Sequence, residues 1–121
     1  MNTVILTGNI SSDVEVRYTQ TGKTVATFSM ATNEKRGDNQ VAQFHRVVAW
    51  EKLAEGCNTY QKGQPVIVIG KSVTRSYEDN NGNKKYITEI IANDVALSAW
   101  ANANNIESNF DSFGSSEEAP F

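Results

Sequence analysis

The chain has 121 residues and a formal net charge of −3, and its length is sufficient for one domain with a core of its own. Its single cysteine, Cys57, cannot form an internal disulfide, so the disulfide-stabilised secreted class is excluded and a reducing compartment such as the cytoplasm is expected. No run reaches the roughly 18 apolar residues of a membrane span, and the first residues read as a strand instead of a signal peptide. We therefore expect no contact with a membrane.

Charge is distributed unevenly along the chain. Residues 1–100 hold all 11 lysines and arginines against 10 acids, whereas residues 101–121 hold 4 acids and no base. The body is thus nearly neutral and the end is acidic. An acidic chain of this kind does not exclude an anionic ligand, because the field that a ligand meets is local.

Three strands rich in β-branched residues are predicted in the first half of the chain. They cover residues 2–19 with an irregular break at 11–13, residues 24–33, and residues 41–50. Residues 34–40 are polar and contain glycine and asparagine, so we expect a loop there.

One helix is predicted, over residues 51–62. Leu53, Cys57 and Tyr60 recur at i, i+4 and i+7 and would form its buried stripe. Gly63 follows at a position typical of a helix end.

The last two strands are predicted to form a long hairpin. Residues 64–73, continuing through 74–78, precede the turn, residues 84–98 follow it, and Asn81-Gly82 in the turn is a strong hairpin signal. We therefore predict an all-β chain: a five-stranded OB-fold barrel with one helix between strands 3 and 4 and a long hairpin between strands 4 and 5. That fold binds single strands across strands 2 and 3. Other small barrels share this order, so function has to be read from the site.

Residues 44–50 are the most informative segment. At strand period, Phe44, Arg46 and Trp50 share one face, and Val47 and Ala49 share the other, which has the composition of a core. Two rings beside a guanidinium suit an unpaired nucleic-acid strand, because its bases are flat and its phosphates are anionic. A strand buried on both faces, with Arg46 reaching its edge, is the alternative that these seven residues leave open.

Several segments together resemble the bacterial-type single-stranded DNA-binding protein family over residues 1–98. The matching segments are Gly8-Asn9, residues 13–18, Ala31-Thr32-Asn33, His45-Arg46-Val47-Val48, Lys52-Leu53-Ala54-Glu55, Lys62-Gly63 and Thr74-Arg75-Ser76-Tyr77. The final Pro120-Phe121 after acidic residues matches again.

This resemblance implies an OB-fold that assembles as a homotetramer and wraps single-stranded DNA with little sequence preference. It implies base stacking on Phe44, Trp50 and Tyr77. It also implies phosphate contacts along the DNA path from Arg46, Lys52, Lys62 and Arg75. His45 falls where the family has a subunit contact, and a histidine satisfied within the core is the alternative.

The composition shifts after Trp100 to mostly Asn, Ser, Ala and Gly, which predicts an OB-fold domain, residues 1–100, and a flexible acidic tail, residues 101–121. The resemblance adds a role for this tail. It implies that the tail recruits replication and repair proteins through a partner-binding tip, and that the protein works in the cytoplasm, at the bacterial nucleoid, during replication, recombination and repair. The tip comprises Glu117, Glu118, Ala119, Pro120 and Phe121. A purely solubilising acidic end is the alternative for these residues.

The sequence departs from the family pattern in three places. Arg36 stands where many relatives have a further tryptophan, which exchanges a stacking contact for a phosphate contact. Val14 replaces a usual proline, and the linker before the acidic tip is almost absent.

Three other functions are alternatives to single-stranded DNA binding. An enzyme is disfavoured because one histidine and one cysteine cannot make a Cys/His zinc site, and no glycine-rich phosphate loop precedes a helix. We expect neither a metal nor a cofactor. An OB-fold adaptor of the primosome-assembly kind would not need the full set of rings, and RNA binding is not separated from DNA binding by stacking alone.

Overall fold

The structure is a computed structural model that describes residues 1–97. The predicted tail, with its partner-binding tip, lies outside the described residues. Within residues 1–97, no helix has the length and apolar character needed to cross a bilayer.

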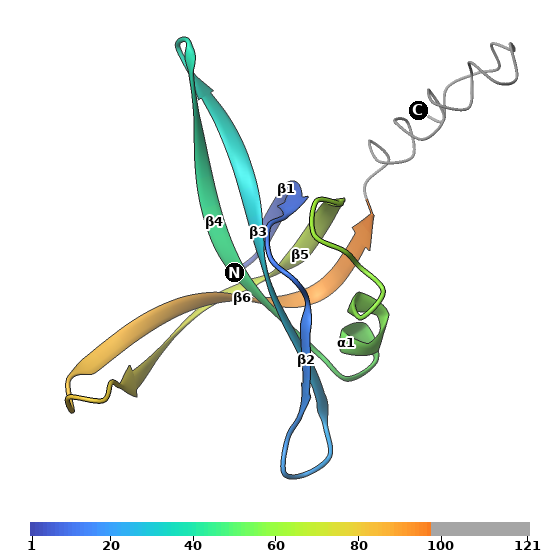
Figure 1. Ribbon diagram of the computed structural model, residues 1–121, viewed down its shortest axis with the longest axis vertical. Coiled ribbons are helices and arrows are strands. Elements are labelled where there is room, and N and C mark those ends of the chain that lie inside the picture. Colours follow the sequence, from blue (N-terminus) through green and yellow to red (C-terminus); the bar gives the residue numbers. More distant parts are fainter. Residues whose placement is uncertain (98–121) are drawn as a thin grey trace, which may run out of the picture.

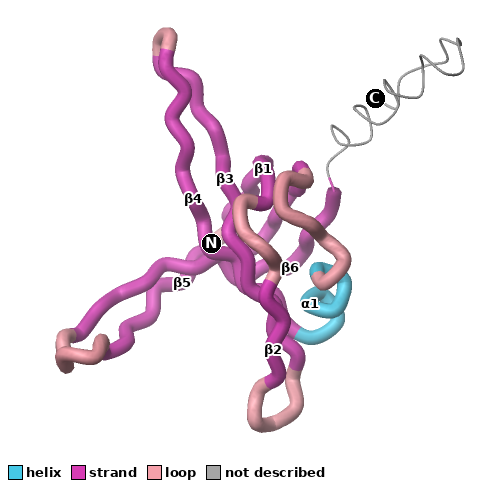
Figure 2. The backbone as a smooth tube through the Cα atoms, in the orientation of Figure 1, coloured by secondary structure: helices cyan, strands magenta, loops and turns pink. Residues whose placement is uncertain are grey.

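Six strands and one short helix make up the described fold (Figures 1 and 2). The elements in chain order are β1 (Val4–Ile10), β2 (Glu15–Tyr18), β3 (Thr24–Arg36), β4 (Asn39–Trp50), α1 (Glu51–Cys57), β5 (Pro65–Glu78) and β6 (Lys84–Leu97). β1 and β2 run one after the other along β3, and the gap between them is bridged where the Ser11 amide donates to the Ser29 carbonyl at 2.8 Å. They correspond to the first predicted strand with its irregular break.

The sheet closes on itself as a barrel. Its strands follow the order β1-β5-β6-β4-β3-β2, and β1 also pairs with β3 through Asn9↔Ala31 and Ile10↔Met30. Gly8 permits this closure, since a Cβ there would meet the Ala31 carbonyl oxygen at 2.0 Å. β4 and β6 pair in parallel, and α1 lies between β4 and β5 in the chain. These features confirm the predicted OB-fold barrel, in which β1 and β2 together form the first of five strands.

The core lies inside the barrel and is built from alternate residues of the strands. Its largest fully buried side chains are Phe28, Ile10, Met30, Val47, Val66, Val68 and Cys57. Burial raises the pKa of the Cys57 thiol to about 11, so the thiol is protonated at neutral pH.

Two long hairpins extend from the barrel in different directions, β3–β4 and β5–β6 (Figure 1). The loop predicted for residues 34–40 was wrong in extent. β3 and β4 stay paired out to Arg36↔Asn39, so that only Gly37 and Asp38 make the turn. Polar residues suit this extension because a projecting hairpin exposes both faces to water. Gly37 takes a φ of 60°, which the tight turn requires.

The predicted helix was too long. α1 ends at Cys57, and Asn58 is its C-cap. Asn58 and Thr59 have low helix propensity and Gly56 precedes them, so the remaining predicted residues form turns instead. The buried stripe is carried by Ala54 and Cys57, with Leu53 and Tyr60 partly buried against the core.

Candidate nucleic-acid interface

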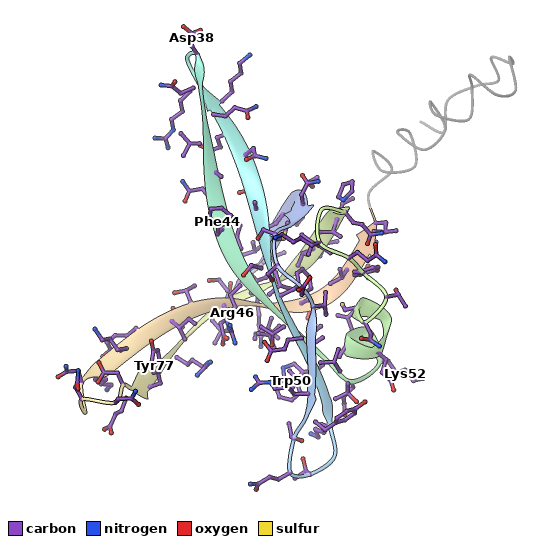
Figure 3. The ribbon with its side chains drawn as sticks, viewed as in Figure 1. Asp38, Phe44, Arg46, Trp50, Lys52 and Tyr77 are labelled. Carbon is purple, nitrogen blue, oxygen red and sulfur yellow. The ribbon has the colours of Figure 1, made fainter. Side chains whose placement is uncertain are left out.

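The β4 side chains alternate between the core and an outer face, as their sequence predicts. Val47 and Ala49 are completely buried, whereas Phe44 is 70% exposed and Trp50 is 41% exposed. The alternative of a strand buried on both faces is therefore wrong for the two rings. Figure 3 shows Phe44 toward the β3–β4 hairpin, Trp50 toward α1, and Arg46 between them.

The register carries this outer face across to β5. Arg46 lies opposite Glu89 on β6, and Glu89 lies opposite Val73 on β5. Arg75 and Tyr77 follow Val73 at strand period and so point to the same side. Tyr77 is 46% exposed. The three predicted stacking rings thus share one face of the sheet, around Arg46 (Figure 3).

A groove of about 480 Å³ lies in this face beside Trp50. Four aliphatic side chains line it, and so do three guanidinium groups. The aliphatic residues are Val25, Val48, Val73 and Ile91, and the cations are Arg17, Arg46 and Arg75. A groove with apolar walls, a ring and several cations suits a ligand that is both flat and anionic.

Glu89 joins two of these cations. Glu89 is only 5% exposed. Its carboxylate accepts a hydrogen bond from Arg46 Nε at 2.6 Å and one from Arg75 Nε at 2.8 Å. The bond from Arg75 is the main reason that the pKa of Glu89 is lowered; the bond from Arg46 acts in the same sense and burial opposes it. The same bond raises the pKa of Arg75. Both guanidinium groups are therefore oriented at the groove by the Glu89 carboxylate.

Comparison with known proteins gives the family. The model described as "Single-strand binding protein family" matches residues 1–98. This chain belongs to the single-strand binding protein family. The match covers all seven elements of the described fold, so family and architecture agree.

Three relatives illustrate the range of similarity among family members. "Single-stranded DNA-binding protein 1" of Chlorobaculum tepidum is 40% identical over 80% of this chain, which covers only 64% of that protein. "Single-stranded DNA-binding protein 3" of Clostridium acetobutylicum is 37% identical over 98% of this chain and 85% of its own length. "Single-stranded DNA-binding protein 1" of Streptococcus pyogenes is 33% identical over 100% of this chain and 99% of its own.

Three cations that the sequence predicts as phosphate contacts, Lys52, Lys62 and Arg36, lie away from the groove. Lys52 is exposed on α1 and lines a smaller cavity of about 230 Å³ with Lys23 and Glu55. Lys62 is exposed in the turn before β5, and the next residue, Gly63, donates its amide to the Ile10 carbonyl at 2.8 Å.

Arg36 lies on the opposite side of the β3–β4 hairpin from Phe44. Phe44 is opposite Ala31, and Lys35 shares the side of Ala31, whereas Arg36 points the other way. Arg36 Nη2 lies 3.7 Å from Glu34 Oε2, and both side chains are exposed. The cation on the same side of the hairpin as Phe44 is therefore Lys35.

Sequence reasoning missed Arg17, Lys35 and Glu89. The available signal for Glu89 was an acidic residue within an apolar strand, between Ile87 and Ile90. It alternates with the core-facing Ile90, which puts it on the groove face. The sequence carries no signal for Lys35 or Arg17, because the side on which each lies depends on which residues of the neighbouring strand it pairs with.

His45 has a partner within the chain. Its Nε2 lies 2.9 Å from Thr32 Oγ1 on β3, and the side chain is half-buried. A subunit contact at His45 stays a prediction. Among residues 1–97, no three His, Cys, Asp or Glu side chains gather where they could hold a metal ion.

Proposed function

We propose that the protein binds single-stranded DNA without sequence specificity, through stacking and phosphate contacts. One observation carries this proposal: Phe44, Trp50 and Tyr77 are exposed on a single sheet face around Arg46 and Arg75. Exposed rings in a row are costly in water and are relieved when bases cover them. The names of the relatives, all single-stranded DNA-binding proteins, support the same ligand.

The proposed contacts explain the preference for unpaired strands. Each stacked base contributes roughly 1–3 kcal/mol, and every base has a flat face, so sequence matters little. A duplex hides these faces and loses that term. Cations at the groove release counterions from phosphates, so the affinity falls as salt rises.

Titration with oligo-dT tests the stacking contacts. Trp50→Ala should weaken binding by ~1–3 kcal/mol, because one base loses its ring. Trp50→Phe is the matched control, since it keeps a ring and should keep most of the affinity. Equal affinities of Trp50→Ala and the parent protein would remove Trp50 from the site. A parallel titration with oligo-U tests RNA as the ligand.

For assembly, we propose a homotetramer, as the family resemblance implies. Ile5 supports an assembly surface, because it is exposed on the outer side of β1. Sedimentation of the full chain should give the mass of four copies, and a monomer would contradict the proposal.

For the tail, we propose that Glu117, Glu118, Ala119, Pro120 and Phe121 bind replication and repair proteins, which places the protein in replication, recombination and repair at the nucleoid. The acids suit basic pockets, and Phe121 supplies an apolar anchor. Deletion of residues 117–121 should abolish capture of those partners and raise DNA affinity slightly at low salt, because a tethered anion no longer competes. A truncated protein that keeps its partners would overturn this role.

A further inference from the structure

The three groove cations are not equivalent. Arg46 and Arg75 share the carboxylate of Glu89, at 2.6 and 2.8 Å, so the cluster of three groups carries a net charge of about +1 at neutral pH. The Glu89 carboxylate therefore already neutralises about half of the combined charge of these two guanidinium groups.

Arg17 is the remaining cation of the groove. It is exposed on β2, and within residues 1–97 no carboxylate lies within ion-pair distance of it. Glu15 lies two residues earlier on the same side of β2 and forms no ion pair with it. The charge of Arg17 is thus available to a ligand in a way that the charges of Arg46 and Arg75 are not.

The sheet register places Arg17 in line with Trp50. Arg17 lies opposite Val25 on β3, and Val25 lies opposite Trp50 on β4. The three residues form a row across neighbouring strands, and all three line the groove. Two strand spacings separate the Cα atoms of Arg17 and Trp50 by about 10 Å. A long arginine side chain and an indole ring can meet one nucleotide across that gap.

We propose that Arg17 binds the phosphate of the nucleotide whose base stacks on Trp50, which extends the DNA path from β4 onto β2. This inference rests on the proposed function of the same face. Val25 between the two residues supplies an apolar surface under the sugar and base, and Arg17 supplies the anion contact beside them. The path then runs from Tyr77 and Arg75 on β5, past Arg46 and Trp50 on β4, to Arg17 on β2.

A salt series with oligo-dT tests this role in the full chain. Arg17→Gln removes one phosphate contact, so the slope of log affinity against log salt should become shallower by about 0.7. Its loss of affinity between 50 and 200 mM salt should be smaller than that of the parent by about 2.6-fold, and its affinity at 50 mM should be lower by roughly 2- to 5-fold. Arg17→Lys keeps the charge and should restore the slope.

Lys84→Gln is the matched control. Lys84 is exposed and lies opposite Glu78, on the side of the β5–β6 hairpin away from Tyr77, so its loss should leave the slope unchanged. A double variant, Arg17→Gln with Trp50→Ala, should lose less than the sum of the single losses, because both residues contact one nucleotide.

The outcomes separate the inference from the function on which it rests. If Trp50→Ala weakens binding while Arg17→Gln has the parent slope and affinity, the role of Arg17 is overturned and the proposed function stands. If the parent protein does not bind oligo-dT, the proposed function itself fails. Thermal unfolding midpoints of Arg17→Gln and the parent should agree, because an exposed side chain without an ion pair is removed.

Discussion

Within residues 1–97, glutamate pairs with arginine in two regions, in the groove at Glu89 and on the β3–β4 hairpin at Glu34. In the groove, a buried carboxylate accepts bonds from two guanidinium groups at 2.6 and 2.8 Å. On the hairpin, Glu34 and Arg36 lie 3.7 Å apart and both are exposed. Exposed pairs are screened by water and contribute little, whereas the buried carboxylate fixes the direction of its partners. The same residue types therefore build an oriented site in one region and only a solvated surface in the other.

Removal of each glutamate is the strongest way to break this comparison. Glu89→Ala should lower the free energy of unfolding by about 2–3 kcal/mol, because the hydrogen bonds to a charged group are lost and the two guanidinium groups face each other. Glu34→Ala is the control and should change it by less than about 0.5 kcal/mol. Denaturant unfolding measures both. Equal losses at the two sites would refute the contrast.

The two sides of the β5–β6 hairpin offer a second contrast, in binding. Tyr77→Ala should weaken oligo-dT binding by ~1–3 kcal/mol, because Tyr77 shares the groove face. Tyr86 is 67% exposed but lies opposite Ser76, on the other side of the hairpin, so Tyr86→Ala should leave the affinity unchanged. If both variants lose the same affinity, the DNA contacts both sides of the β5–β6 hairpin and is not confined to the groove face.

Acid should remove the contribution of Glu89 to the free energy of unfolding. The pKa of Glu89 is lower in the folded protein than in the unfolded chain, so its contribution to stability is complete above the unfolded pKa of about 4.3. That contribution disappears as the pH falls through the folded pKa. Unfolding of the parent and of Glu89→Gln, measured from pH 7 down to pH 3, should show a stability difference that shrinks below about pH 4. A difference independent of pH would contradict the role given to the carboxylate.

The smallest expected effect compares neighbouring cations of the β3–β4 hairpin. Lys35→Gln should make the salt slope of oligo-dT binding shallower by up to about 0.7, because Lys35 shares the side of Phe44. Arg36→Gln should leave the slope unchanged, since its side chain points away and meets Glu34. The reverse result would restore the phosphate contact that the sequence predicts for Arg36.

The sequence predicted what is local. The alternation of residues 44–50 put Phe44 and Trp50 on the face opposite Val47, because a strand turns each successive side chain to the other face. The structure then showed that the face of the two rings is exposed. The Asn81-Gly82 turn was predicted from the same kind of signal, and Gly82 takes a φ of 80°.

What the sequence did not predict depends on pairing between distant segments. Glu89 acts through Arg46, 43 residues earlier, and their contact exists only because β4 and β6 pair in parallel. Arg17 joins the groove only through the β2–β3–β4 register. The length of the β3–β4 hairpin was also missed, because polar residues read as a loop when the two-residue turn that pairs them is not recognised.

The fluorescence of Trp50 tests the central claim most directly. In a Trp100→Phe variant, all tryptophan emission comes from Trp50, and titration with oligo-dT should quench it until the site is saturated, because a base lies against the indole. A duplex of the same length should leave the emission unchanged. Full binding of oligo-dT with no change in Trp50 emission would show that unpaired bases do not lie on this face.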